Sequence, residues 1–254
     1  MFRRLFPAGR LIGVLMVAGS LAALAQAHTA AHNDEAMAGH MDMSSLKPLQ
    51  PGDKERAAAI VAAARKAADP YKDYHKALED GYAIFLPEVK QNVYHFTNYA
   101  HAYRNNMNFD PSRPTSLLYE KAPAKAAGPA GYKLVGVMYT APYEVPEEEL
   151  NRRVPLSIAR WHLHTNLCLP ADNDVRGDHL DDPDLVGTNA KFGLQGSITT
   201  ATACRAAGGR FVHHVFGWMV HVYPYESDPK KIWASGMDDM HGMDHDSMPM
   251  DMPM

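Results

Sequence analysis

WHLHTNLC (residues 161–168) places two histidines two positions apart in a run whose composition is typical of a β-strand. Alternate side chains of a strand point to the same face, so His162, His164 and Asn166 should project together. Neutral imidazoles are common metal ligands, and two of them on one face are a frequent beginning of a metal site. The stretch therefore predicts a strand that carries a candidate metal-binding face.

A second histidine-bearing run, VHHVFGWMVHVY (residues 212–223), follows later in the chain. It also reads as a strand, broken near Gly217, in which Met219, His221 and Tyr223 share one face. We expect the two runs to meet, with His221 joining the two histidines of the first run around a metal ion. His213 and His214 are adjacent and point to opposite faces, so at most one of them could join.

Two further residues in predicted strands could complete the ligand set. His95 lies within the predicted strand 93–97, and Glu120 ends the predicted strand 116–120. Three histidines, with or without a carboxylate, would suit zinc, iron, manganese or copper, and an open coordination position would allow catalysis. The ligand types resemble those of cupin-like barrels, although the glycine spacing of the cupin motifs is absent.

Each of these residues also has a structural interpretation. A single buried histidine is usually a hydrogen-bonded core residue, but two at this spacing with others in separate strands favour a metal site. Met219 could be a soft ligand for copper or could pack in the core beside Trp218 and Val220, and the second reading is the simpler one.

The chain has two cysteines, Cys168 and Cys204. In an oxidising compartment an isolated pair most simply forms a disulfide, worth roughly 3–4 kcal/mol in the chain-entropy model. The alternative is that Cys168, which falls on the same alternate face as the two histidines of its run, is a thiolate ligand.

Residues 1–27 have the pattern of a secretory signal peptide: a basic start, an apolar stretch from Leu11 to Leu24, and Ala25-Gln26-Ala27 as a cleavage site. We expect an exported, periplasmic protein with no stable membrane insertion after cleavage; an uncleaved anchor is the alternative. Loss of three signal-peptide arginines would take the formal net charge from −4 to −7. Such a charge argues against a nucleic-acid partner and suits a protein that attracts cations. Any protein partner is unknown.

Both ends of the mature chain are rich in histidine and methionine. Residues 28–50 are expected to form a disordered arm, and residues 236–254 a disordered tail in which seven of nineteen residues are methionine. Thioethers select Cu(I) over zinc or magnesium, so the tail predicts copper capture. The capturing residues would be Met237, Met240, His241, Met243, His245, Met248 and Met250. This composition resembles the ends of bacterial periplasmic copper-tolerance proteins.

Between these ends, residues 51–235 are expected to fold as one α+β domain. An alanine-rich helix over 54–68, capped by Asp53, and a second helix from Pro70 to Asp80, stopped by Gly81, come first. Strands are predicted at 93–97, 116–120, 132–139, 158–167 and 211–223, with a short helix capped by Thr199 before the last. This order indicates an antiparallel sheet, curved as a small sandwich or barrel.

Several motifs resemble those of an uncharacterised family of exported bacterial proteins. They are YHFTN at 94–98, RPTSLLYE at 113–120, YKLVGVMY at 132–139, WHLH at 161–164 and GWMVHV at 217–222. The resemblance spans residues 94–226 and implies one domain, but it implies no activity.

Three functions are compatible with these features. The first is a periplasmic transition-metal protein, with copper favoured and zinc or iron as alternatives, acting in buffering, delivery or tolerance. The second is a metal-dependent oxidoreductase or hydrolase with a cupin-like histidine site. The third is an envelope interaction protein in which the first histidine run is packed and hydrogen-bonded without a metal. No phosphate-binding glycine loop or serine nucleophile elbow is present to suggest other chemistry.

Overall fold

The computed structural model describes residues 39–85, 87, 91–121, 131–170, 190–193 and 196–234. The predicted signal peptide, residues 28–38 of the arm and the tail at 236–254 lie outside these described residues. Expectations about those segments therefore stay predictions.

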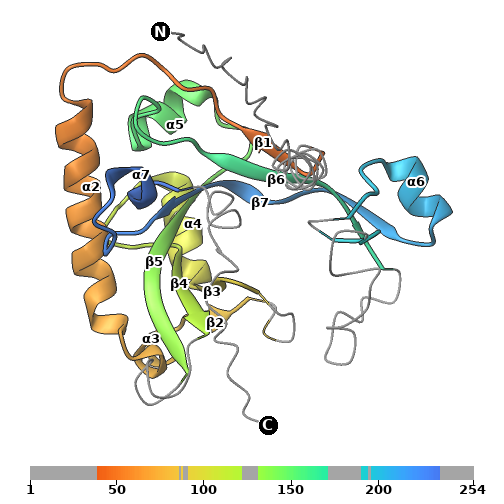
Figure 1. Cartoon of the computed structure of the whole chain (residues 1–254), viewed down its shortest axis with the longest axis horizontal. Coiled ribbons are helices and arrows are strands. Elements are labelled where there is room, and N and C mark those ends of the chain that lie inside the picture. Colours follow the sequence, from red (N-terminus) through yellow and green to blue (C-terminus); the bar gives the residue numbers. More distant parts are fainter. Residues whose placement is uncertain are drawn as a thin grey trace, which may run out of the picture.

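Within the described residues the core element is a seven-stranded antiparallel sheet with the order β1-β6-β7-β5-β4-β3-β2 (Figure 1). The sheet is open, because β1 and β2 form its two edges, and it is not closed into a barrel. The predicted α+β class, with helices before an antiparallel sheet, is confirmed. The strands are β1 (Met41–Met43), β2 (Ala83–Ile84), β3 (Tyr94–Thr97), β4 (Ser116–Lys121), β5 (Tyr132–Ala141), β6 (His162–Leu169) and β7 (Arg210–Val222).

The predicted helical pair is present, with its second member divided. The helices are α2 (Asp53–Ala68), the 3-10 turn η1 (Asp69–Tyr71), α3 (Tyr74–Glu79), α4 (Tyr99–Met107), α5 (Glu147–Arg153), α6 (Ala201–Ala206) and α7 (Pro229–Ile232). Gly81 follows α3 at a φ of +85°, the left-handed conformation that ends a helix and that glycine adopts without strain.

Two predicted helix caps differ from the structure by one position. Asp53 is the first residue of α2 and not its cap; its carboxylate accepts hydrogen bonds from the Gln50 amide and the Ser157 hydroxyl. Thr200, and not Thr199, caps α6, because its hydroxyl accepts from the Ala203 amide. Cap positions shift easily because neighbouring polar residues compete for the same free amides.

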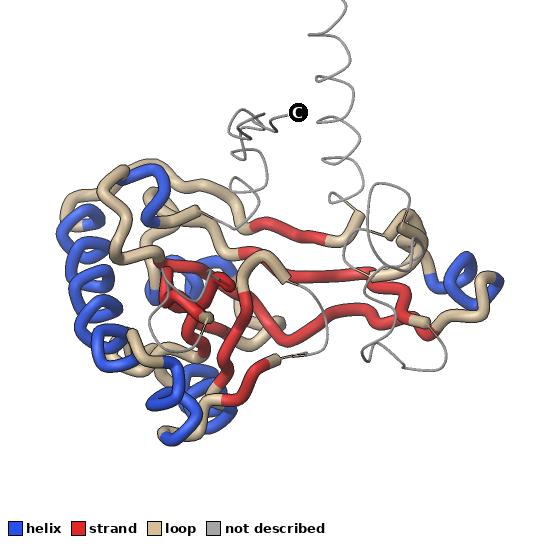
Figure 2. The backbone as a smooth tube through the Cα atoms, turned by 60° about the horizontal axis from the view of Figure 1, so that its bottom comes forward, coloured by secondary structure: helices blue, strands red, loops and turns tan. Residues whose placement is uncertain are grey.

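One face of the sheet is covered by α2, which runs along one side of the molecule (Figures 1 and 2). Ile60, Ala64 and Ala68 of this helix pack in a large apolar core with sheet residues. The sheet residues of that core alternate along the strands: Tyr94 and Phe96 on β3, Leu117 and Tyr119 on β4, Val137 and Tyr139 on β5, and Val220 and Val222 on β7. The residues between them must therefore point to the opposite face.

β6 and β7 continue beyond the rest of the sheet as a two-stranded ribbon with α6 near its far end (Figure 1). A disulfide joins Cys168 of β6 to Cys204 of α6, with Cα atoms 5.5 Å apart. The predicted disulfide is therefore confirmed, and the alternative role of Cys168 as a thiolate ligand does not hold in this structure.

The part of the arm that the structure describes is ordered in the sheet, which corrects the expectation of disorder across residues 28–50. β1 pairs antiparallel with β6, with Met41 opposite His164 and Met43 opposite His162. Residues around β1 are also held by side chains, since the Ser44 hydroxyl accepts from the Trp161 amide. The sequence of this segment alone predicts no structure, because the strand that orders it lies more than a hundred residues further along the chain.

No helix in the described ranges has the length and apolar character needed to cross a membrane.

Candidate metal centre

Four histidines lie together on the face of the sheet opposite α2. His162 and His164 come from β6, His221 from β7 and His95 from β3. The centre of the His162 ring is 4.9 Å from that of His221 and 5.3 Å from that of His164, and the His95 and His221 rings are 5.6 Å apart. Imidazoles that share one tetrahedral ion, at about 2.0–2.1 Å from it, have ring centres roughly 5 Å apart. Each of these three neighbouring pairs therefore has the spacing of two ligands on one ion, with His162 and His221 each belonging to two of the pairs.

The contact between His95 and His221 depends on curvature of the sheet. β5 and β4 lie between their strands, so a flat sheet would hold the two backbones about 14 Å apart at the usual strand spacing. The 5.6 Å between ring centres therefore requires the sheet to curl toward the histidine face and the rings to lean together.

Gly136 permits this close approach. A Cβ atom at this position of β5 would lie 2.7 Å from the Val222 carbonyl oxygen and 2.9 Å from the Tyr223 ring. Any side chain here would push against β7, so glycine is required where the curl is tight.

Several ring nitrogens of His162, His164 and His221 have no partner in the described part of the chain, whereas His95 makes a hydrogen bond with the Val93 backbone. His162 and His221 are buried, and no hydrogen-bond partner is present for Nδ1 of His162, Nδ1 of His164, or either ring nitrogen of His221 within the residues described. Buried polar atoms in proteins are nearly always hydrogen-bonded, and an unpaired one costs about 1–3 kcal/mol. A bound ion or an ordered water would satisfy such atoms.

Burial keeps these rings neutral. Loss of solvation lowers the pKa of His95 to about 4, that of His162 to about 3 and that of His164 to about 4. The pKa of His221 is lowered well below its ordinary value, first by burial and then by the neighbouring rings. The neutral imidazole is the form that binds a metal, so at neutral pH no proton has to leave before an ion enters.

Methionines flank the histidines in cross-strand register. Met43 of β1 and Met219 of β7 lie on either side of His162, Met41 lies opposite His164, and Met138 of β5 lies opposite His221. Directly opposed residues in an antiparallel pair have side chains on the same face, about 5 Å apart at Cβ. Among the described strands, the face of the sheet that carries the histidines therefore also carries methionine side chains.

A fifth histidine, His40, stands next to this group. It is buried just before β1, its Nε2 lies 2.5 Å from the Gly196 carbonyl oxygen, and its Nδ1 has no partner among the described residues. Nothing in the local sequence marks His40 for the site, because only the pairing of β1 with β6 brings it there.

Other predicted site residues lie elsewhere. Glu120 is exposed near the end of β4, opposite Lys133, and so is not part of the buried cluster. His214 stacks on Tyr143 at 4.2 Å between ring centres, and His213 is exposed beside Phe211. The tail residues Met237, Met240, His241, Met243, His245, Met248 and Met250 lie outside the described part of the chain.

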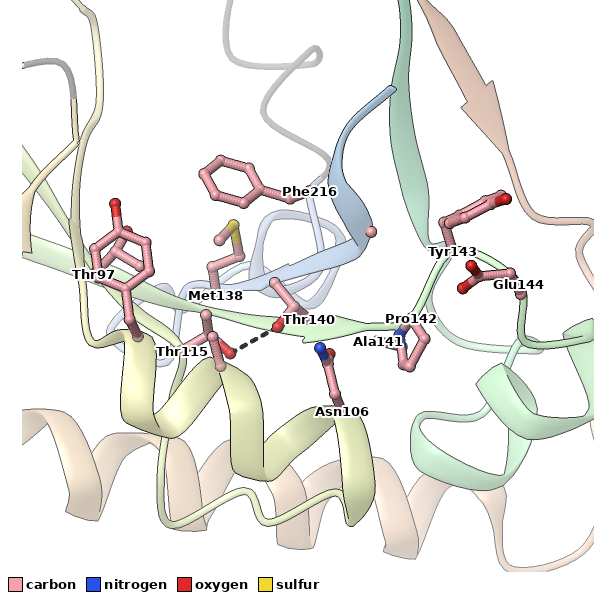
Figure 3. Close-up of a pocket in the computed structure, with 13 residues that line it drawn as sticks. Thr97, Asn106, Thr115, Met138, Thr140, Ala141, Pro142, Tyr143, Glu144 and Phe216 are labelled. Carbon is pink, nitrogen blue, oxygen red and sulfur yellow. Dashed lines mark hydrogen bonds between the residues drawn. The ribbon is translucent and has the colours of Figure 1, made fainter. Parts of the chain in front are cut away.

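A small pocket of about 260 Å³ adjoins the histidine face (Figure 3). Thr97, Met138 and Thr140 contribute its polar and sulfur-bearing wall, and Tyr99, Tyr143 and Phe216 its aromatic rim. In Figure 3 the Met138 side chain points from β5 toward the Phe216 ring, and Thr140 is hydrogen-bonded to Thr115. Met138 is also the cross-strand partner of His221, so one residue of the pocket wall lies next to the histidine cluster, although none of the four histidines lines the pocket.

In the described ranges, no three histidine, cysteine, aspartate or glutamate side chains are already arranged as a complete metal-binding set. Ring centres at ligand-like spacing therefore coexist with ring orientations that would have to adjust to bind an ion. Comparisons with protein-family models, with curated proteins and with solved structures find no match. The resemblance to a family of exported bacterial proteins thus stays a prediction.

Proposed function

We propose that this protein binds a transition metal, with copper favoured, at the cluster of His95, His162, His164 and His221. Its role would be buffering, delivery or tolerance of the metal in the periplasm. The observation that carries the proposal is His221: its two ring nitrogens are buried with no hydrogen-bond partner among the described residues, and its ring centre lies 4.9 Å from that of His162. A metal ion would satisfy such atoms, and a water molecule would do so only with further polar partners.

Copper is favoured over zinc and iron by the composition around the rings. Imidazole suits all three metals, whereas thioether sulfur favours Cu(I). Methionines lie beside the histidines in the sheet, and more are present in the tail sequence. The signal-like start of the chain and the Cys168–Cys204 disulfide support an oxidising, extracytoplasmic compartment.

Metal analysis of protein purified without an affinity tag tests this proposal. We expect bound copper to remain in a variant that lacks residues 236–254 and to be lost from a variant that also carries His162→Gln and His221→Gln. His213→Gln, an exposed histidine on the same strand as His221, is the matched control and should retain the metal. Copper that disappears with the tail alone would reject a site in the folded domain.

A metal-dependent enzyme is the second candidate, because Met138 lines a pocket and lies opposite His221 in the sheet. An oxidoreductase or hydrolase would need an open coordination position that faces this pocket. Thr140→Val and Phe216→Ala alter the pocket wall and leave the histidines in place. If the protein is an enzyme, these variants should bind metal normally and lose turnover in a screen of oxidase and hydrolase substrates. If the metal-loaded protein shows no turnover in that screen, the enzyme candidate is rejected and the metal-binding role remains.

A further inference from the structure

Met43, His162 and Met219 lie side by side across three strands, and this arrangement indicates which ion the site would select. Met43 on β1 and Met219 on β7 are the two direct cross-strand neighbours of His162, so a histidine ring is flanked by a thioether on each side. His221 is two residues beyond Met219 on the same strand and the same face. Two soft sulfur atoms and two imidazoles are thus placed around one region of the sheet.

We infer that Met43 and Met219 are ligands that make this site selective for monovalent copper. The inference rests on the proposed metal-binding function and specifies its ion. Thioethers hold Cu(I) well and zinc poorly, so a mixed set of imidazole and thioether ligands separates these ions where imidazoles alone would not.

The burial of the two methionines differs in a way that fits this role. Met219 is buried, in an apolar cluster with Leu118, Met138 and Tyr223. Met43 is half-buried on a three-residue edge strand. Met219 is therefore a fixed part of the site, and Met43 is supplied by a short strand that only β6 holds in the sheet. Binding of the ion would add a bond between β1 and the rest of the sheet.

Core packing is the competing explanation for Met219, and substitution by leucine separates the two. Leucine has nearly the volume of methionine and preserves packing at a cost usually under about 1.5 kcal/mol, but it has no sulfur. Met219→Leu and Met43→Leu should therefore fold and lose only the thioether. Met107→Leu, exposed on α4, is the matched control.

The test uses the full-length protein with ¹³C-labelled methionine methyl groups, each resonance assigned by its Met→Leu variant. One equivalent of Cu(I), added without oxygen, should shift the methyl resonances of Met43 and Met219 together with the ring resonances of His162 and His221. Each of the two leucine variants should lose about tenfold in Cu(I) affinity, measured against a coloured Cu(I) chelator, while zinc affinity stays within about twofold. Met107→Leu should match the wild type.

The possible failures are distinguishable. Ring resonances that shift while the methyl resonances of Met43 and Met219 do not would overturn the sulfur ligands and leave the histidine site intact. Shifts confined to tail methionines would reject both the sulfur ligands and the proposed function. Equal losses of Cu(I) and zinc affinity in the leucine variants would show that the methionines act through packing and not as ligands.

Discussion

The two faces of the curled sheet are built from alternate residues of the same strands, yet they differ in chemistry. The helix-covered face carries Phe96, Tyr119 and Tyr139, packed with α2 into one apolar core. The opposite face carries His95, His162 and His221 with methionines between them. Buried imidazoles without partners weaken a fold, whereas buried aromatic rings strengthen it. The first face therefore accounts for stability, and the second is the face on which we propose that an ion binds.

We expect the largest loss of stability from a substitution in the helix-covered face. Phe96 is fully buried and contacts the rings of Tyr74, Tyr119 and Tyr132. Phe96→Ala should lower the free energy of unfolding by about 3–5 kcal/mol, because it removes a large side chain and leaves a cavity. Urea denaturation followed by circular dichroism measures this loss. A loss under about 1 kcal/mol would mean that this face does not carry the stability.

The second largest effect should be a loss of stability at acidic pH, caused by the buried histidines. In the folded apoprotein the pKa of His162 is about 3, below the value of about 6.5 in the unfolded chain. The unfolded state then binds more protons below pH 6.5, so stability is full above that pH and falls as pH decreases toward the folded pKa. We expect a loss on the order of 2–3 kcal/mol for His162 between pH 6.5 and 4.5.

Denaturation of metal-free protein at half-unit pH steps checks this window. His162→Leu is the control, and its stability should depend less steeply on pH in the same range. An unchanged slope in that variant would show that His162 is already protonated or exposed in the folded protein.

Gly136 tests the curl that brings the two ends of the cluster together. Gly136→Ala should cost about 1–3 kcal/mol, since its Cβ would meet the Val222 carbonyl at 2.7 Å and force β5 and β7 apart. Metal affinity should fall as well, because Gly136 lies in the cross-strand row of His95 and Leu118, between His95 and β7. Calorimetric titration alongside denaturation measures both. Gly52→Ala, where a Cβ meets no atom but φ is +86°, separates general glycine strain from loss of curvature.

The smallest expected effect has the opposite sign. His221→Leu replaces an unpaired buried imidazole by an apolar side chain of similar size, so the apoprotein should be more stable by about 1 kcal/mol. The same variant should lose the extra stability that copper gives the wild type. Thermal denaturation with and without copper measures both quantities. Marked destabilisation of the apoprotein would indicate a hydrogen-bonded structural role for His221.

The sequence predicts the strands well where apolar residues alternate and proline or glycine bounds the run. β4 and β7 therefore begin or end within one residue of the prediction. β1 is missed because its three residues are polar or methionine and gain their order only from β6. α4 is missed because its sequence, YAHAYRNNM, has no continuous apolar stripe.

For the candidate site, the spacing of His162 and His164 predicts their common face, and alternation predicts that of His221. The approach of His95 depends on strand order and curvature, which local sequence does not encode. The same holds for Met43, whose position beside His162 follows from a long-range register. The place of Glu120 at a strand end predicts a ligand, but the end of β4 is exposed, and Glu120 is not among the buried rings.

If copper binds as proposed, the rings of separate strands meet at one ion. An anomalous difference map at the copper absorption edge, from crystals loaded with one equivalent of copper, tests it most directly. We expect a single strong peak between the His162 and His221 rings, at about 2.0–2.1 Å from a ring nitrogen of each. A map with no peak on this face of the sheet, and with ordered water bridging those nitrogens, would contradict it.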